Sequence, residues 1–278
     1  MAIPKQVTRG NLVFDVTESG PADGTPVLLL HGFPQHASSW GRLVPMLNDQ
    51  GYRTLAMNQR GYSPGATPKG RSAYKIPDLV ADAVAVIDEL AGGHAHVVGH
   101  DWGAAVVWAL GAAHPEKVRS LTALSVPHVG AFLSAMPRSR QGLKSWYMLA
   151  FQLPWLPERL LGTRYERMIA GWGQKAEAAR RDAAEFDGPK SFTGPLNWYR
   201  AMPLTDLRSA FEKVRVPTLF VWSDGDVAID KYGAHNCGKY VDAPYRFETL
   251  HGVSHWILDE APAEVAALLL PHLKEYSR

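Results

Sequence analysis

The chain has 278 residues, of which 46% are hydrophobic, and its formal net charge at pH 7 is +2. Such a chain can bury one sizeable core and leaves room for an inserted subdomain. The balanced charge, without runs of like sign, excludes the basic stripe expected of a nucleic-acid-binding protein. The single cysteine, Cys237, excludes an intramolecular disulfide and a thiolate metal cluster.

The N-terminal residues lack the continuous apolar segment of a secretory signal. No stretch approaches the roughly 18 uncharged apolar residues of a membrane-spanning helix. We therefore expect a soluble cytoplasmic protein with no membrane partner, either a monomer or a homodimer.

Short apolar segments alternate with segments of helical periodicity along the first part of the chain. Alternation with a period of two predicts an edge strand, and short apolar runs predict buried parallel strands. Helical spacing predicts a helix over 76–90, where Asp78 is placed to cap the start, and a second helix over 103–115. The strands predicted here are 11–18, 26–30, 52–57, 95–99 and 118–126.

The pattern changes after residue 128, where Trp, Tyr, Met, Pro and Arg become dense and the periodicity is helical without strands. Strands return over 217–223 and 245–250, and a last helix is predicted over about 260–275. This order predicts an α/β fold, a doubly wound and mostly parallel sheet, with a helical lid inserted in it. We divide the chain into a first core segment (1–128), the lid, or cap domain (129–212), and a second core segment (213–278).

The segment VVGHDWGAAV places Asp101 at a strand-to-helix turn between two glycines. A side chain at Gly99 or Gly103 would clash in so tight a turn, and the central residue is forced outward as a nucleophile. The N-terminus of the following helix favours an anion, so we expect Asp101 to stay ionised. An aspartate that only caps the helix is the alternative, but the flanking glycines and the buried strand favour the nucleophile.

The loop after the second predicted strand begins His31-Gly32-Phe33-Pro34. In hydrolases with such a turn, the oxyanion hole combines an N–H of this loop with the N–H of the residue after the nucleophile. Here these are the N–H groups of Phe33 and Trp102. Taken alone, the loop is also compatible with an ordinary turn between a strand and a helix.

A catalytic triad also needs a base and an acid that orients it. Three aspartates follow the first strand after the lid, and we favour Asp226 over Asp224 and Asp230 because Asp-Gly is a common turn dipeptide. The base is expected at His255, in a small-residue loop before the last helix, which gives the chain order nucleophile, acid, base. His251 in the same loop is the alternative.

These motifs resemble those of the epoxide hydrolases in the α/β-hydrolase superfamily, and the resemblance covers nearly the whole chain. HGFP at 31–34 matches the HGxP motif of that family, and GHDWG at 99–103 matches its nucleophile turn. The resemblance implies a double displacement. The carboxylate of Asp101 attacks a substrate carbon and forms an ester, which is hydrolysed by water that His255 activates with Asp226 behind it.

Two lid segments add to the resemblance. KSWYMLAFQLPWLPE and LNWYRAM resemble the segments that carry the two ring-opening tyrosines of the family, which fall on Tyr147 and Tyr199. Simple packing is the alternative role, since the lid has other tyrosines, such as Tyr165. One departure is Asn58, where the family usually has aspartate, at a position with a structural role.

The same chemistry serves a second leaving group, so a haloalkane or fluoroacetate dehalogenase is the alternative function. Trp102 and the tryptophan-rich lid favour it, because a departing halide accepts hydrogen bonds from N–H groups. Phe33, where many haloalkane dehalogenases have asparagine, and the two tyrosines favour an epoxide, whose oxygen needs a proton. The absence of serine at the turn argues against a serine esterase, and the full set of nucleophile, base and acid argues against a non-catalytic binding protein.

We expect the substrate to be a small-molecule epoxide that is apolar or aryl, because the lid is rich in aromatic residues. The reaction needs no metal and no organic cofactor.

Overall fold

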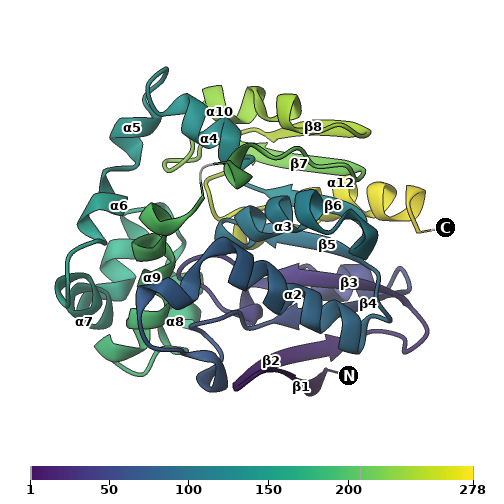
Figure 1. Ribbon diagram of the computed structural model, residues 1–278, viewed down its shortest axis with the longest axis horizontal. Coiled ribbons are helices and arrows are strands. Elements are labelled where there is room, and N and C mark those ends of the chain that lie inside the picture. Colours follow the sequence, from purple (N-terminus) through teal and green to yellow (C-terminus); the bar gives the residue numbers. More distant parts are fainter. Residues whose placement is uncertain (1, 207, 278) are drawn as a thin grey trace.

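The computed structural model describes residues 2–206 and 208–277 of the chain. They form an eight-stranded sheet in the order β1-β2-β4-β3-β5-β6-β7-β8, with helices on both faces (Figure 1). β2 pairs antiparallel with β1 and with β4, and the other neighbours are parallel. The strands are β1 Ile3–Arg9, β2 Leu12–Ser19, β3 Thr25–Leu30, β4 Tyr52–Met57, β5 Ala95–His100, β6 Val118–Leu124, β7 Thr218–Ser223 and β8 Tyr245–Leu250.

The doubly wound, mostly parallel sheet predicted from the sequence is therefore confirmed. β4 and β8 have the predicted bounds, and the other predicted strands differ by one or two residues at their ends. β1 was not predicted, because Val7 is its one buried side chain and no alternation is visible. Its pairing with β2 along the sheet edge makes it a strand.

The described residues form twelve α-helices, joined by loops and short 3₁₀ turns. α2 has the predicted bounds, but the expectation that Asp78 caps it is wrong. The cap position is Lys75, and Asp78 lies in the first turn, 3.9 Å from the guanidinium of Arg9. The helices are α1 Val44–Asn48, α2 Ile76–Leu90, α3 Trp102–Ala113, α4 Val129–Ala135, α5 Gln141–Lys144, α6 Trp146–Ala150, α7 Leu156–Ala170, α8 Ala176–Ala183, α9 Thr193–Ala201, α10 Lys231–His235, α11 Ile257–Glu260 and α12 Pro262–Glu275.

Each face of the sheet has its own apolar core. Alternate side chains of β3 show the division, because Leu28 and Leu30 pack with α2 and α3, whereas Val27 and Leu29 pack with α1, α11 and α12. This burial on both faces explains why the central strands are continuous apolar runs. The loops at the carboxyl ends of the parallel strands are left at one edge, where such sheets bind ligands.

In the described part of 129–212 there are helices and no strand. α5 to α9 lie together beside the sheet, on the left in Figure 1. A separate apolar cluster joins the lid to the loop after β3, with Phe33 packed against lid side chains such as Leu196 and Tyr199. The helices of the lid thus cover the edge of the sheet where the candidate residues lie.

A buried polar network also ties the lid to the core. Arg181 of α8 donates to the carboxylates of Asp182 and of Asp259 in α11, each at 2.7 Å. Gln35, which follows the HGFP loop, donates to the same two carboxylates at 2.9 and 3.2 Å. Breaking such a network would leave buried charges without partners, so it holds the lid in one position.

Among the described residues, no helix has the length and apolar character that crossing a bilayer requires.

Candidate active site

Asp101 occupies a strained turn between β5 and α3. Its backbone has a φ of 52° and a ψ of −116°, a region that costs a non-glycine residue about 1–3 kcal/mol. A Cβ at Gly99 would overlap the backbone of Gly103, and a Cβ at Gly103 would overlap the carbonyl oxygen of Leu30. The two glycines therefore permit the turn, as their spacing in the sequence indicates.

The carboxylate of Asp101 is held from two sides. The backbone N–H of Phe33 donates to Oδ1 at 2.7 Å, and Nε2 of His255 lies 3.4 Å from Oδ2. Burial on its own would raise the pKa of Asp101, but the hydrogen bond and charge of His255 outweigh this effect and lower the pKa. The side chain is 14% exposed, and it is ionised at neutral pH.

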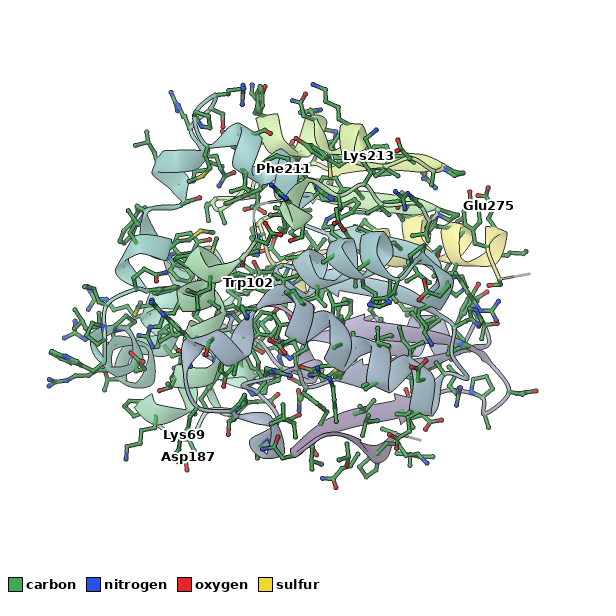
Figure 2. All side chains as sticks on the ribbon, viewed as in Figure 1. Lys69, Trp102, Asp187, Phe211, Lys213 and Glu275 are labelled. Carbon is green, nitrogen blue, oxygen red and sulfur yellow. The ribbon has the colours of Figure 1, made fainter. Side chains whose placement is uncertain are left out.

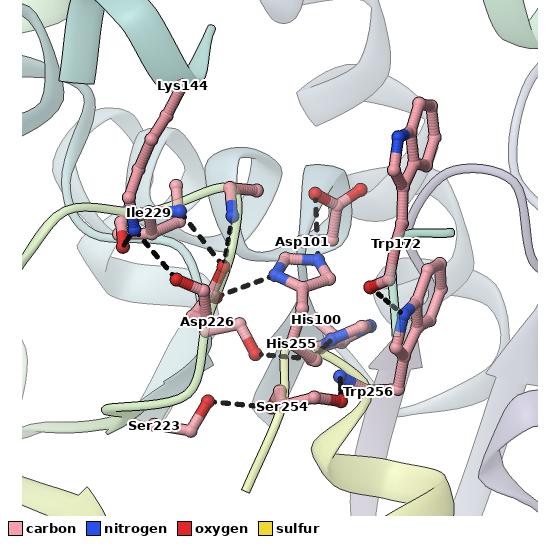
Figure 3. A network of polar contacts seen from close by, with 12 residues as sticks. His100, Asp101, Lys144, Trp172, Ser223, Asp226, Ile229, Ser254, His255 and Trp256 are labelled. Atoms are coloured by element: carbon pink, nitrogen blue, oxygen red, sulfur yellow. Dashed lines mark hydrogen bonds and ion pairs between the residues drawn. The ribbon is translucent and has the colours of Figure 1, made fainter. Parts of the chain in front are cut away.

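His255 lies between two carboxylates (Figure 3). Its Nδ1 is 2.7 Å from Oδ2 of Asp226, on the side of the ring opposite Asp101. Burial alone would lower the pKa of His255, but the charge of Asp226 and the hydrogen bonds to both carboxylates raise the pKa to about 10. The imidazole is therefore a cation while Asp101 is a free carboxylate.

The candidate acid, Asp226, is fixed by its own loop. Oδ1 of Asp226 accepts from the backbone N–H groups of Ala228 and Ile229, at 2.7 and 2.9 Å. These two bonds orient the carboxylate so that Oδ2 faces the imidazole of His255.

The other candidates for acid and base lie elsewhere. Asp224 and His251 are both exposed and pair with each other, at 2.7 Å from Oδ2 to Nδ1. Asp230 caps α10 by accepting from the N–H of Tyr232. Of the three aspartates after β7, Asp226 is thus the one bonded to His255.

Exchanging Asp226 for asparagine tests this arrangement. We expect Asp226→Asn to lower kcat at least about 100-fold, because an amide stabilises the imidazolium poorly and can fix the wrong tautomer. Asp224→Asn is the matched control and should stay near the wild-type rate, since its partner is the surface residue His251. Equal losses in the two variants would contradict the assignment.

The HGFP loop is anchored under the site. The ring of His31 is fully buried, and its Nε2 accepts from the N–H of Gln59 at 3.2 Å. A Cβ on Gly32 would come within 2.6 Å of Oδ1 of Asp101, so glycine permits this approach. The carbonyl oxygen of Pro34 accepts from the hydroxyl of Tyr165 in the lid at 2.9 Å. These contacts place Phe33 N–H against the carboxylate.

Asn58, which stands where aspartate is usual among the sequences that the motifs resemble, has a structural role. Its Oδ1 accepts from the backbone N–H of Ala37 at 2.8 Å. An amide oxygen performs this task as a carboxylate oxygen would, so the change leaves Asp101 and its contacts intact.

Trp102 opens α3, so its backbone N–H is a first-turn donor without an acceptor inside the helix. Figure 2 shows the residue between the sheet and the lid. Its indole ring packs edge-on against Tyr199 with ring centroids 5.1 Å apart. Two backbone N–H groups thus lie next to the Asp101 carboxylate along different segments, that of Phe33 from the HGFP loop and that of Trp102 from the turn itself.

Two cavities meet at Asp101, Tyr147 and Tyr199. The larger, about 440 Å³, also contacts His255 and Trp172. The smaller, about 130 Å³, extends between the lid and α3 and is lined almost entirely by apolar side chains. The ring centroids of the two tyrosines are 6.1 Å apart. Burial raises the pKa of both phenols, and the charge of Asp101 raises the pKa further, so both are protonated.

Sequence reasoning missed two residues at the site. Nζ of Lys144 in α5 donates to the carbonyl oxygens of Asp226 and Ile229, at 2.8 and 3.0 Å (Figure 3). His100, next to Asp101, lies 3.0 Å from the carbonyl oxygen of His255, and burial lowers the pKa of His100 to about 4, so it is neutral. No motif identifies Lys144, whereas His100 lies within GHDWG and could have been noted.

The fold and the site together define a hydrolase of the α/β class with aspartate at the nucleophile turn. Residues 25–262 match the family described as alpha/beta hydrolase fold, and the chain belongs to it. It is 34% identical to epoxide hydrolase A of Mycobacterium tuberculosis, with 93% of each chain covered. It is 32% identical to the AB hydrolase superfamily protein YfhM of Bacillus subtilis, with 96% of each covered.

Among solved structures, epoxide hydrolase A from Mycobacterium thermoresistibile matches with a TM-score of 0.86 at 29% identity, covering 99% of this chain and 98% of that one. The resemblance to the epoxide hydrolases that the motifs indicate is therefore confirmed.

Proposed function

We propose that the chain is an epoxide hydrolase, which converts an epoxide to a vicinal diol through an ester formed on Asp101. One observation carries the proposal. The carboxylate of Asp101, with Nε2 of His255 at 3.4 Å, borders the same cavity as the two lid tyrosines. A nucleophile, a base and two proton donors thus surround one space.

In the first step, Asp101 attacks one epoxide carbon. A C–O ester bond forms, the ring C–O bond breaks, and the departing oxygen takes a proton from Tyr147 or Tyr199. Esterification removes the negative charge of Asp101, which had raised the pKa of both phenols. Loss of the phenol proton therefore becomes easier as the carboxylate is consumed.

Esterification also changes His255. One of the two carboxylates that raise its pKa is now neutral, so the pKa falls and the cation can return a proton to the tyrosine phenolate. The imidazole that results is neutral and can act as a base. Asp226 keeps the ring oriented through this change.

In the second step, His255 takes a proton from water, and the hydroxide attacks the ester carbonyl. The N–H groups of Phe33 and Trp102 stabilise the oxyanion, each by about 3 kcal/mol. The bond between the carbonyl carbon of Asp101 and the ester oxygen of the product then breaks, and this oxygen takes the proton from His255 to become a hydroxyl of the diol. The acid form of Asp101 loses its own proton to the imidazole, which restores the carboxylate and the cation.

Residues 129–212 would act as the lid over this site, and the apolar lining of the smaller cavity favours an epoxide with an apolar or aryl substituent. The cytoplasmic location and the monomeric or homodimeric state stay predictions from the sequence.

Removing the two phenol hydroxyls distinguishes epoxide opening from dehalogenation. We expect Tyr147→Phe and Tyr199→Phe each to slow turnover of styrene oxide, and the double variant to lower it about 10²- to 10⁴-fold, the usual contribution of general acid catalysis. The wild type should form diol from styrene oxide and release little halide from a bromoalkane or fluoroacetate in parallel assays.

A halide departs without a proton, so any dehalogenase activity should survive in the double variant. A double variant that opens epoxides at the wild-type rate, or a wild type that prefers the halogenated substrates, would make the dehalogenase the better assignment. Tyr240→Phe is the control, because its hydroxyl pairs with that of Ser134 and the residue lines neither cavity at Asp101.

A further inference from the structure

The lid has an exposed apolar surface at the open end of the larger cavity. Leu143 of α5 and Trp146 of α6 line this cavity and are 77% and 64% exposed. Val227 lines it from the loop after β7 and is 51% exposed. The opening is therefore bordered by apolar side chains on both the lid and the core.

The surface continues along the lid. Leu149 lies three residues after Trp146 on α6, so the two share a helix face, and it is 77% exposed. Of the eleven large apolar side chains exposed among the described residues, six lie within 143–156. Single exposed apolar residues are ordinary, but a group of six so close together along the chain indicates a binding surface. The lid apolar surface comprises Leu143, Trp146, Leu149, Leu153, Trp155 and Leu156.

Trp155 is held in an unfavourable conformation. Its φ is 51°, in the left-handed region that disfavours bulky residues, and its side chain is 66% exposed. Asparagine tolerates this region better. Because the ring is mostly exposed, packing within the chain does little to offset this unfavourable backbone conformation.

The segment of the chain that carries the lid apolar surface is basic. Glu158 is the one acidic residue within 136–164, and it is buried and paired with Arg200 at 2.6 Å. The basic residues of the same range are Arg138, Arg140, Arg159 and Arg164, together with Lys144, whose ammonium is bonded to the loop of Asp226.

We propose that the lid apolar surface docks on an anionic lipid bilayer, with α5 and α6 lying in its interface and the open end of the cavity facing the apolar phase. Exposed Trp and Leu flanked by Arg and Lys are typical of helices that lie in a membrane interface. Docking needs no spanning helix, and it revises the expectation of no membrane partner. An apolar epoxide dissolved in the bilayer would enter directly, a consequence that rests on the proposed function.

The charge favours lipid over a second copy of the chain. Two copies meeting through this surface would bring basic residues together, whereas anionic headgroups complement them. Basic side chains can also extend toward headgroups while their carbon stems cover apolar surface.

Sedimentation with lipid vesicles tests the proposal. We expect the protein to co-sediment with vesicles of phosphatidylglycerol and phosphatidylcholine, to bind pure phosphatidylcholine at least 10-fold more weakly, and to dissociate in high salt. The double variant Leu149→Gln, Trp155→Asn should lower vesicle binding at least 10-fold. Neither residue lines the cavities around Asp101, and asparagine suits the backbone at 155, so turnover of a water-soluble epoxide should be unchanged.

Ile3→Gln and Phe211→Gln are matched controls, because both residues are exposed and apolar and neither lines the larger cavity. Ile3 begins β1, which lies on the opposite side of the molecule from α5 and α6 (Figure 1). No vesicle binding, or binding that the double variant leaves intact, would overturn the proposal. A dimer in sedimentation equilibrium that the double variant abolishes, without vesicle binding, would assign the surface to a second copy. Binding is measured without turnover, so failure of the epoxide assay alone would overturn only the proposed function.

Discussion

Replacing Asp101 with alanine should abolish epoxide turnover while the chain still folds. The variant has no carboxylate to form the ester, so we expect kcat to fall by at least about 10⁴-fold, as when the nucleophile of a triad is removed. His255 loses one of the two carboxylates that raise its pKa to about 10, so its pKa should fall. Steady-state assays with styrene oxide and an NMR titration of His255 check both effects.

Folding of this variant can be followed by circular dichroism during heating. The lost contacts are one hydrogen bond from Phe33 and one interaction with His255, and an unpaired buried N–H costs about 1–3 kcal/mol. Asp224→Ala is the matched control, because Asp224 is an exposed aspartate in the loop after β7. An active Asp101→Ala variant would remove the basis of the proposed mechanism.

Replacing His255 with glutamine should separate the two steps. Ester formation needs Asp101 and the tyrosines, whereas hydrolysis needs the base, so the ester should accumulate. We expect mass spectrometry after incubation with styrene oxide to find the peptide containing Asp101 heavier by one substrate molecule. Turnover should fall by about 10²-fold or more, the loss expected when a general base is removed.

His251→Gln is the control for this experiment, since His251 lies in the same loop but is exposed and paired with Asp224. It should turn over substrate normally and show no adduct. Normal turnover in His255→Gln, or an adduct on another peptide, would mean that the base or the nucleophile has been wrongly assigned.

The sequence predicts the central strands and the nucleophile turn because each has a strong local signal. β3 and β5 are continuous apolar runs, and the glycines around Asp101 are required by backbone contacts within the turn. β1 lacks such a signal, because its strand conformation depends on pairing with β2. Local pattern thus identifies strands whose sequences are apolar or alternate, the other edge strand β8 included, and misses β1, which shows neither pattern.

The turn pattern favours Asp226 over Asp224, but local pattern alone could not settle the choice. The two residues are two positions apart in one loop, and only their surroundings in the fold separate them, one on the surface with His251 and one buried with His255. Lys144 is a similar case, because its bonds to the loop of Asp226 join segments over eighty residues apart. Contacts of this kind leave no mark in a single sequence.

Oxygen isotope labelling in a single turnover tests the ester on Asp101 most directly. The experiment uses enzyme in excess over styrene oxide in H₂¹⁸O. One oxygen of the diol is the original epoxide oxygen. Because water attacks the carbonyl carbon of the ester, the second, added oxygen comes from the Asp101 carboxylate. We expect the diol of the first turnover to contain no ¹⁸O, and the peptide containing Asp101 to carry the label. A first-turnover diol labelled with ¹⁸O, together with an unlabelled Asp101 peptide, would show direct attack of water on the epoxide and would contradict the covalent mechanism.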